Sequence, residues 1–184
     1  MGTLGPNDGN TFANDGTVGT IAVTNPSNAR LADNTYCTSV LLLGQITNYL
    51  KATNFGFTIP LDATVDGIVI EIEKSTTIAT SITDNSVKIV KGGTVVGSEL
   101  ASATQWGTTD AYATYGTPTE LWGTTWTPSD INGSTFGIVV SGIAALAATA
   151  QIDHIRVSVY YTGSNKAGNL SKNVKVSGGM SVSG

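Results

Sequence analysis

The sequence predicts an all-β protein, most simply an antiparallel β-sandwich of the jelly-roll type with about eight to ten short strands. Apolar residues alternate with polar ones at a period of two in several short runs. Clusters of Gly, Asn, Asp, Pro and Ser separate these runs, as turns between strands require. No amphipathic helical pattern of useful length interrupts them, and the uneven loop lengths disfavour an up-and-down barrel.

The most regular strand lies within residues 55–74, where two extended segments join at Ile59 and Pro60. One face of the second segment is β-branched and consists of Ile68, Ile70 and Ile72. The opposite face carries Val69, Glu71 and Glu73. This alternation predicts a strand with one face buried, against which the other strands pack.

Ahead of this strand, residues 1–17 are rich in Gly, Asn, Asp and Thr, which predicts an irregular N-terminal arm. The sandwich domain is expected to occupy residues 18–162. Its first strands are predicted at residues 18–23, 36–43 and 46–54. The apolar run YCTSVLLL at 36–43 indicates a strand buried on both faces.

After the central strand in the sequence, a polar segment over residues 75–86 ends in a predicted turn at 84–86. Gly92 and Gly93 separate two short β runs and predict a hairpin, because glycine readily adopts the positive φ of primed turns. The later predicted elements are strands at 136–140 and 152–161 and a loop at 144–150.

The last segment, residues 163–184, combines a polar linker with a strand-like C-terminal arm. Four apolar side chains share one parity in this arm: Val174, Val176, Met180 and Val182. The linker of about ten residues spans up to about 35 Å when extended. The arm therefore either folds back onto its own sheet or adds to the open edge of a neighbouring subunit.

Charge and cysteine content exclude several classes of protein. Only 12% of the 184 residues are charged, the net charge is −4 and the pI is about 4.7, so nucleic-acid binding is not expected. Low charge instead fits a surface that neighbours bury. The single cysteine, Cys37, allows no intrachain disulfide and is expected to be buried. The sequence predicts neither a membrane span nor a signal peptide, so we expect assembly inside a cell.

Candidate catalytic residues are few. The single histidine, His154, follows Asp153, and neighbours on a strand point to opposite faces, so we expect a surface histidine rather than a catalytic pair. Glu71 and Glu73 lie about 7 Å apart on one strand face, a spacing that suits glycoside hydrolysis. No further acid supports them, and solvent-facing strand charges are the simpler interpretation.

Candidate metal ligands and catalytic motifs are equally scarce. Turn residues Asp62, Asp66 and Asp84 are candidates for a structural calcium ion, but the ordered spacing of a calcium loop is absent. The sequence contains no nucleophile elbow, zinc-helix motif or phosphate-binding loop. We therefore expect neither enzymatic activity nor a cofactor.

An aromatic cluster is the remaining candidate site. Its members lie close together in the sequence and are Trp106, Tyr112, Tyr115, Trp122 and Trp126. The motif WGTT occurs at both 106–109 and 122–125. Exposed rings of this kind bind sugars by stacking, whereas buried ones close one end of a sandwich core or a subunit interface. Both interpretations remain open from the sequence.

Four segments carry a family resemblance: NPSNARLADNTY at 25–36, YLKATNFGFTIPLDATVDGIVIEIEK at 49–74, ELWGTTWTPSDINGSTFGIVVSG at 120–142 and IDHIRVSVYYT at 152–162. Together they resemble a recurring β-sandwich domain of tailed-bacteriophage virion structural proteins, of the capsid-decoration or head- or tail-fibre type. The likeness covers roughly residues 20–162 and rests on the IP-x-x-A-T-x-x-G-I and W-T-x-x-D-I-N patterns. It implies a structural role in the virion and brings no catalytic residues.

These observations favour a capsid decoration protein. It is expected to bind a major capsid protein and copies of itself through its arms, on a virion assembled in the host cytoplasm. Two alternatives remain. The aromatic cluster is compatible with a fibre module that binds host surface glycans, and the C-terminal arm with a donor-strand filament subunit, which would need an export route.

Overall fold

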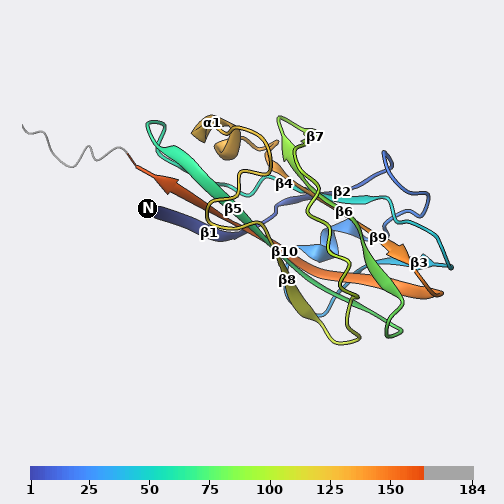
Figure 1. Cartoon of the computed structure of the whole chain (residues 1–184). Helices are drawn as coiled ribbons and strands as arrows, with labels where there is room; N and C mark the ends of the chain where they lie inside the picture. The colour runs from blue at the N-terminus through green and yellow to red at the C-terminus, as the bar shows by residue number, and fades with distance from the viewer. Residues whose placement is uncertain (164–184) are drawn as a thin grey trace, which may run out of the picture.

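The computed structural model describes residues 1–163 and confirms an all-β fold of two antiparallel sheets packed face to face (Figure 1). The first sheet has the order β1-β10-β5-β8, with β3 beside the other half of the β10 edge. Its strands are β1 (Gly2–Asp8), β3 (Cys37–Leu41), β5 (Thr64–Thr76), β8 (Ala111–Tyr115) and β10 (Ala148–Thr162).

The second sheet has the order β2-β4-β9-β6-β7. Its strands are β2 (Thr11–Asp15), β4 (Tyr49–Thr53), β6 (Ile82–Lys91), β7 (Thr94–Val96) and β9 (Gly137–Ala144). The helical elements are a 3-10 turn, η1 (Pro26–Ala29), and one short helix, α1 (Pro128–Asn132). Within residues 1–163, no helix is long and apolar enough to cross a membrane.

The strand pairs are nested along the chain. β6 pairs with β7, β5 with β8, β4 with β9 and β3 with β10, all antiparallel. Successive pairs alternate between the two sheets, so the chain from β3 to β10 follows the path of one long hairpin rolled into two layers. β1 and β2 then extend one sheet each.

The core lies between the two sheets and confirms the predicted inner face of the central strand. Side chains of β5 and β10 that point inward are fully buried, and they are Ile68, Ile70, Ile72, Ile155, Val157 and Val159. The second sheet contributes Val87, Ile89, Ile138 and Val140. Burial of β-branched side chains on both inner faces is what holds a sandwich together.

The predicted glycine hairpin is also confirmed. β6 and β7 pair up to Lys91 and Thr94, so Gly92 and Gly93 alone form the loop. Both have positive φ, 59° and 85°, the geometry that a two-residue primed turn requires.

The structure corrects the prediction of an irregular N-terminal arm over residues 1–17. β1 pairs with β10 and β2 pairs with β4, while Leu4 and Phe12 pack against the core. Most other side chains of these two strands are exposed or half-buried, so apolar alternation does not mark them. Backbone hydrogen bonds to β10 and β4 order the segment instead.

Two predicted loops are strands. β6 begins at Ile82, so residues 84–86 lie within it, at a register shift between Asp84 and Ser86. Residues 144–150 contain the end of β9 and the start of β10, with a turn only at 145–147. Their polar or small residues resemble loop composition, but the neighbouring strands supply the hydrogen bonds that make them β.

Residues 55–59 are the first of the two predicted extended segments, and they join no sheet. Their side chains are nevertheless buried in alternation, at Phe55, Phe57 and Ile59. Instead the side chain of Asn132 takes the place of a strand partner for Ile59. Its amide oxygen accepts from the Ile59 N–H at 2.7 Å, and its amide nitrogen donates to the Ile59 carbonyl at 2.8 Å. The extended segment thereby gains both hydrogen bonds of a strand pair.

We therefore predict that Asn132→Ala destabilises the fold by about 1–3 kcal/mol, because it leaves the Ile59 N–H and C=O without partners. Urea unfolding followed by tryptophan fluorescence measures the change. Asn132→Asp is the matched variant: it keeps the acceptor, loses the donor and should fall between the wild type and the alanine variant. A loss below about 0.5 kcal/mol for Asn132→Ala would show that the bridge contributes little.

Candidate functional site

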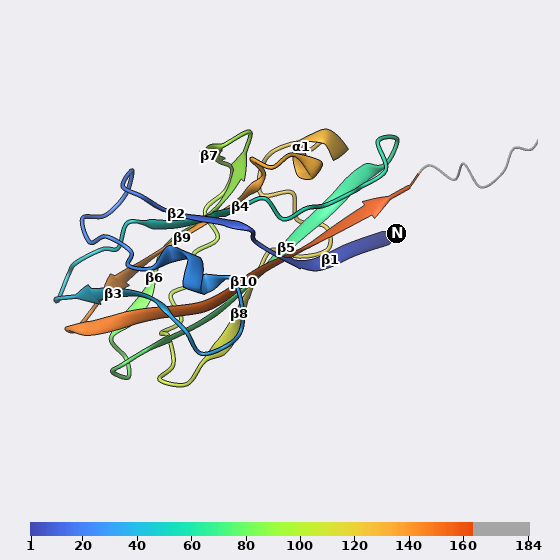
Figure 2. The same cartoon turned by 180° about the vertical axis from the view of Figure 1, so that it is seen from behind.

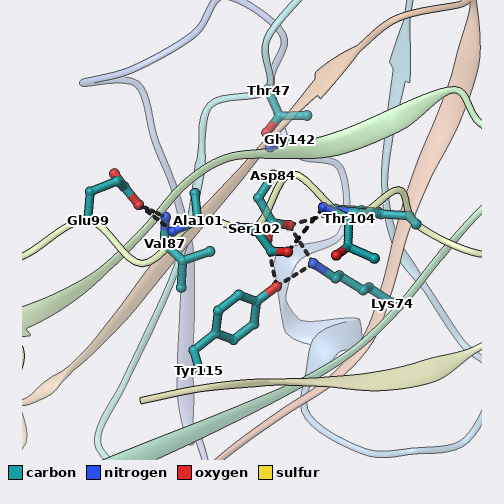
Figure 3. A network of polar contacts seen from close by, with 11 residues as sticks. Thr47, Lys74, Asp84, Val87, Glu99, Ala101, Ser102, Thr104, Tyr115 and Gly142 are labelled. Carbon is teal, nitrogen blue, oxygen red and sulfur yellow. Dashed lines mark hydrogen bonds and ion pairs between the residues drawn. The ribbon is translucent and has the colours of Figure 1, made fainter. Parts of the chain in front are cut away.

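The carboxylate of Asp84, on β6, lies buried between the two sheets and accepts four hydrogen bonds. Figure 3 shows Asp84 with Lys74, Ser102 and Tyr115 around it. One oxygen accepts from the Lys74 ammonium and from the indole N–H of Trp106 at 2.8 Å. The other accepts from the Tyr115 hydroxyl at 2.7 Å and from the backbone N–H of Ser102 at 3.0 Å. Lys74 comes from β5 and Tyr115 from β8, so this cluster connects one sheet to the other.

The sequence parity of β5 explains why a lysine reaches this position. Lys74 continues the inward-facing series Ile68, Ile70 and Ile72, and its ammonium therefore enters the space between the sheets. It lies 4.7 Å from the ring centroid of Trp106 and 5.1 Å from that of Tyr115. Aromatic faces stabilise a cation at such distances.

Burial changes the proton affinities of this cluster. It lowers the pKa of Lys74 below its usual value, although the attraction of Asp84 opposes that change. It raises the pKa of Tyr115 well above its usual value, and the nearby Asp84 charge adds to the increase. Tyr115 is therefore a neutral hydrogen-bond donor throughout the physiological range.

A groove of about 350 Å³ opens beside the cluster. Its walls include Lys74, Trp106, Tyr112 and Tyr115, together with residues of the loop that precedes β8. Both oxygens of Asp84 are occupied by donors, so neither is available as a general base. The arrangement acts as a brace between the sheets.

On the outer face of the first sheet, charged side chains pair with one another. Arg156 donates two hydrogen bonds to Glu71, both of 3.0 Å, and its guanidinium lies 4.1 Å from the Tyr112 ring centroid. The Tyr112 hydroxyl contacts Nδ1 of His154 at 2.7 Å, and Nε2 of His154 contacts Asp8 at 2.9 Å. Glu71 is thus held in an ion pair, which differs from the free carboxylate pair that hydrolysis requires.

The prediction of a surface histidine is wrong, because His154 is only 6% exposed. Its backbone bridges to Arg30, between the parts of the β10 edge that pair with β1 and with β3, and its ring contacts Tyr112 and Asp8. Asp153 adds an extra residue to β10 opposite β5, as the register shift shows. As predicted, Asp153 and His154 do not bond to each other; Asp153 accepts from the backbone N–H of Asn34 at 3.2 Å instead.

The aromatic cluster is mostly core. Trp106, Tyr115, Trp122 and Trp126 are each at most 9% exposed, and Tyr112 is half-buried. The Trp122 indole N–H donates to the carbonyl of Ile68 at 3.0 Å. The Trp126 ring packs edge-on against the Phe136 ring, with 5.4 Å between the ring centroids. Rings buried in this way offer no open face for sugar stacking, so the burial favours the core interpretation.

The three aspartates considered as calcium ligands do not form a common site. Asp84 belongs to the buried cluster, and Asp66 accepts from the hydroxyl of Thr162 at 2.6 Å. Among residues 1–163, no group of three acidic, histidine or cysteine side chains is arranged to hold a metal ion. Asp62, the third candidate, is not part of such a group.

Cys37 is buried, as predicted, and burial raises the pKa of its thiol to about 12. The four residues singled out in the C-terminal arm, Val174, Val176, Met180 and Val182, lie outside the described residues.

An exposed apolar surface, which we call the apolar tip, occupies one end of the sandwich. It consists of Val40, Leu42, Leu43, Ile78 and Leu146, each 48–73% exposed. The turns that carry these residues adjoin one another: the Gly44 N–H donates to the Ala144 carbonyl at 2.7 Å, and the Leu146 N–H to the Ser81 carbonyl at 3.4 Å.

The apolar tip corrects the prediction for the run at 36–43. That run forms β3 only from Cys37 to Leu41, with one face buried, while Val40, Leu42 and Leu43 point into solvent. The tip also carries no charge, since residues 38–48, 75–83 and 141–152 contain no Asp, Glu, Lys or Arg. A run of three leucines reads as core in a sequence, and only the topology shows that its end leaves the sheet.

We predict that Asp84→Ala destabilises the fold more than Lys74→Met. Removing Asp84 takes the shared acceptor from four donors and leaves the buried Lys74 cation without a counter-ion, a change expected to cost about 3–5 kcal/mol. Lys74→Met leaves Asp84 with three of its four donors, and methionine fills a similar volume. Chemical denaturation of both variants measures the difference. An equal loss, or a larger one for Lys74→Met, would contradict the role of Asp84 as the centre of the cluster.

Tyr115 should also determine part of the stability at alkaline pH. Because its folded pKa is raised, its contribution is complete below pH 10.0, the ordinary tyrosine value, and is lost as the unfolded state ionises above it. Lys74, with a lowered pKa, has the opposite sign, and its contribution levels off as the unfolded lysine deprotonates around and above pH 10.5. Above pH 10.5, Tyr115→Phe should reduce the fall in unfolding free energy by up to about 1.4 kcal/mol per pH unit.

Urea unfolding at several pH values between 10.5 and 11.5 measures this slope. The matched control is Tyr160→Phe, which removes a hydroxyl outside the cluster and keeps Tyr115. Identical slopes for Tyr115→Phe and the wild type would contradict the assignment.

No protein-family model matches the chain, and comparisons with curated proteins and with solved structures find no match.

Proposed function

We propose that this protein is a non-enzymatic structural subunit that attaches to a larger assembly, most specifically a capsid decoration protein of a bacteriophage virion. The observation that carries the proposal is the apolar tip, where five large apolar side chains lie exposed on the end of β3 and on adjoining turns, without a charged residue among them. Clustered exposure of this kind marks an interaction surface, whereas single exposed apolar residues are ordinary.

The distribution of charge supports docking at the tip. The core of a protein interface is depleted of charged residues, because each charge would lose its hydration on binding. In this chain the outer face of the first sheet holds Glu71, Glu73 and Arg156, while the tip holds none. Binding at the tip would therefore bury apolar side chains without removing water from a charged group.

We further propose that the sandwich is a jelly roll. Support comes from the nested pairs β3 with β10, β4 with β9, β5 with β8 and β6 with β7, which alternate between the sheets. Eight strands wound in this way make two Greek keys, an architecture common in viral capsid and lectin domains. The fold agrees with the family resemblance of residues 20–162, and it leaves the partner to be argued from the surface.

The proposed partners are a major capsid protein and further copies of this chain, and the proposed location is the virion, assembled in the host cytoplasm. The sandwich would act as a rigid body whose two sheets are joined by the Asp84 cluster. Binding would come from apolar burial at the tip and from the C-terminal segment. The chain needs no cofactor for this role.

Deleting residues 163–184 should weaken attachment without unfolding the domain, because the described strands and core cluster lie within residues 1–162. We expect the thermal midpoint of the truncated protein to stay within a few degrees of the full chain. Occupancy of particles that lack the protein, measured by electron microscopy and gel densitometry, should fall at least tenfold. Equal occupancy would refute the role of the segment. Failure of the full chain to bind particles would refute the decoration function itself.

A further inference from the structure

The apolar tip lies at one end of β10 and the described chain ends at the other. β10 begins beside the tip at Ala148 and runs the length of the first sheet to Thr162. Both views show the start of β10 and strand β3 at the end opposite to the N-terminus and to the last described residues (Figures 1 and 2). The segment that follows Thr162 therefore leaves the sandwich far from its own tip.

We infer that the apolar tip is the receptor for residues 174–182 of a second copy of this chain. The inference rests on the proposed structural function and names the surface and the segment through which copies join. It makes the contact directional, since one copy contributes its tip and the next contributes its C-terminal segment.

The chemistry of the two parts is complementary. In residues 173–184 the apolar side chains share one parity, Gly and Ser occupy most of the remaining positions, and Lys175 is the one charged residue. An extended segment with this pattern presents an apolar edge and a small, polar edge. The tip offers apolar side chains on β3 and three turns and carries no charge, so the apolar edge of the segment and the tip could meet without burying an unpaired ion.

The length of the chain favours a second copy over the same copy. β10 has 15 residues and spans about 50 Å at the usual strand rise. Residues 163–173 span at most about 40 Å when fully extended, and a return toward the tip also needs a turn. The whole run 174–182 thus cannot lie across the tip of its own subunit, whereas the tip of a neighbour is unrestricted.

A contact between two different surfaces is heterologous, so it produces rings or open chains rather than a closed two-fold dimer. Every copy carries one donor segment and one receptor tip. Blocking either part should prevent self-association, and mixing a blocked donor with a blocked receptor should restore a single contact. This complementation distinguishes the inferred pairing from nonspecific hydrophobic association.

The experiment uses two full-length variants. In the receptor variant, Leu43→Asp and Leu146→Asp place charges on the tip; in the donor variant, Val176→Asp and Val182→Asp place charges on the apolar parity of the segment. Sedimentation velocity over a range of concentrations gives the species present. We expect concentration-dependent oligomers for the wild type, monomers for each variant alone, and heterodimers that grow no further for the equimolar mixture.

Matched controls test position rather than charge alone. Leu61→Asp changes a leucine that is 77% exposed but lies outside the tip, and Ser181→Asp changes the opposite parity of the segment. Both should associate like the wild type, within threefold in apparent Kd. Because every substituted tip residue is exposed, circular dichroism should show native spectra for all variants.

Three results would overturn the inference: a wild type that stays monomeric at all concentrations, variants that associate as the wild type does, or a mixture that stays monomeric. The proposed function is judged separately by binding to particles. If the full chain binds particles but the mixture of the two variants stays monomeric, the decoration function stands and the tip is not the receptor. If the full chain binds no particles, the function fails whatever the mixing experiment shows.

Discussion

The buried carboxylate of Asp84 determines how the two sheets meet. A carboxylate without water needs donors for both oxygens, and here they come from β5, β8 and the loop that leads into β8. Apolar contacts between two sheets depend little on direction, so they alone allow one sheet to shift over the other. The four hydrogen bonds to Asp84 are directional and would break in such a shift, so they fix the register of one sheet over the other. The structure thereby gains specificity at a cost in desolvation.

That fixed register is what places the apolar tip. The turns at 42–45, 77–81 and 145–147 connect or follow strands of different sheets, and they adjoin only when the sheets are aligned. Lys74 and Asp84 lie a few residues from the turn between β5 and β6, so the brace acts close to the tip. A rigid end with exposed apolar side chains loses little conformational entropy when it binds.

Much of the fold follows from the sequence because sandwich strands alternate. Ile68, Ile70 and Ile72 predict a buried face from three residues, and Gly92 and Gly93 predict a hairpin from two. The N-terminal strands do not follow from it, because backbone hydrogen bonds to β10 and β4 order them while most of their side chains stay exposed. Patterns report side-chain burial, and a strand added at a sheet edge can have very little of it.

The Asp84 cluster and the apolar tip are also only partly predictable from the sequence. Lys74 continues the isoleucine parity of β5, and that signal alone could have placed a buried cation in the core, but its partner Asp84 resembles a turn residue in sequence. The leucines after β3 resemble core because composition cannot reveal where a chain leaves a sheet. Both errors depend on contacts between residues far apart in the chain. An assembly surface is hardest to predict for the same reason: side chains that a partner will bury follow the rules of a core, and the single chain leaves them in water.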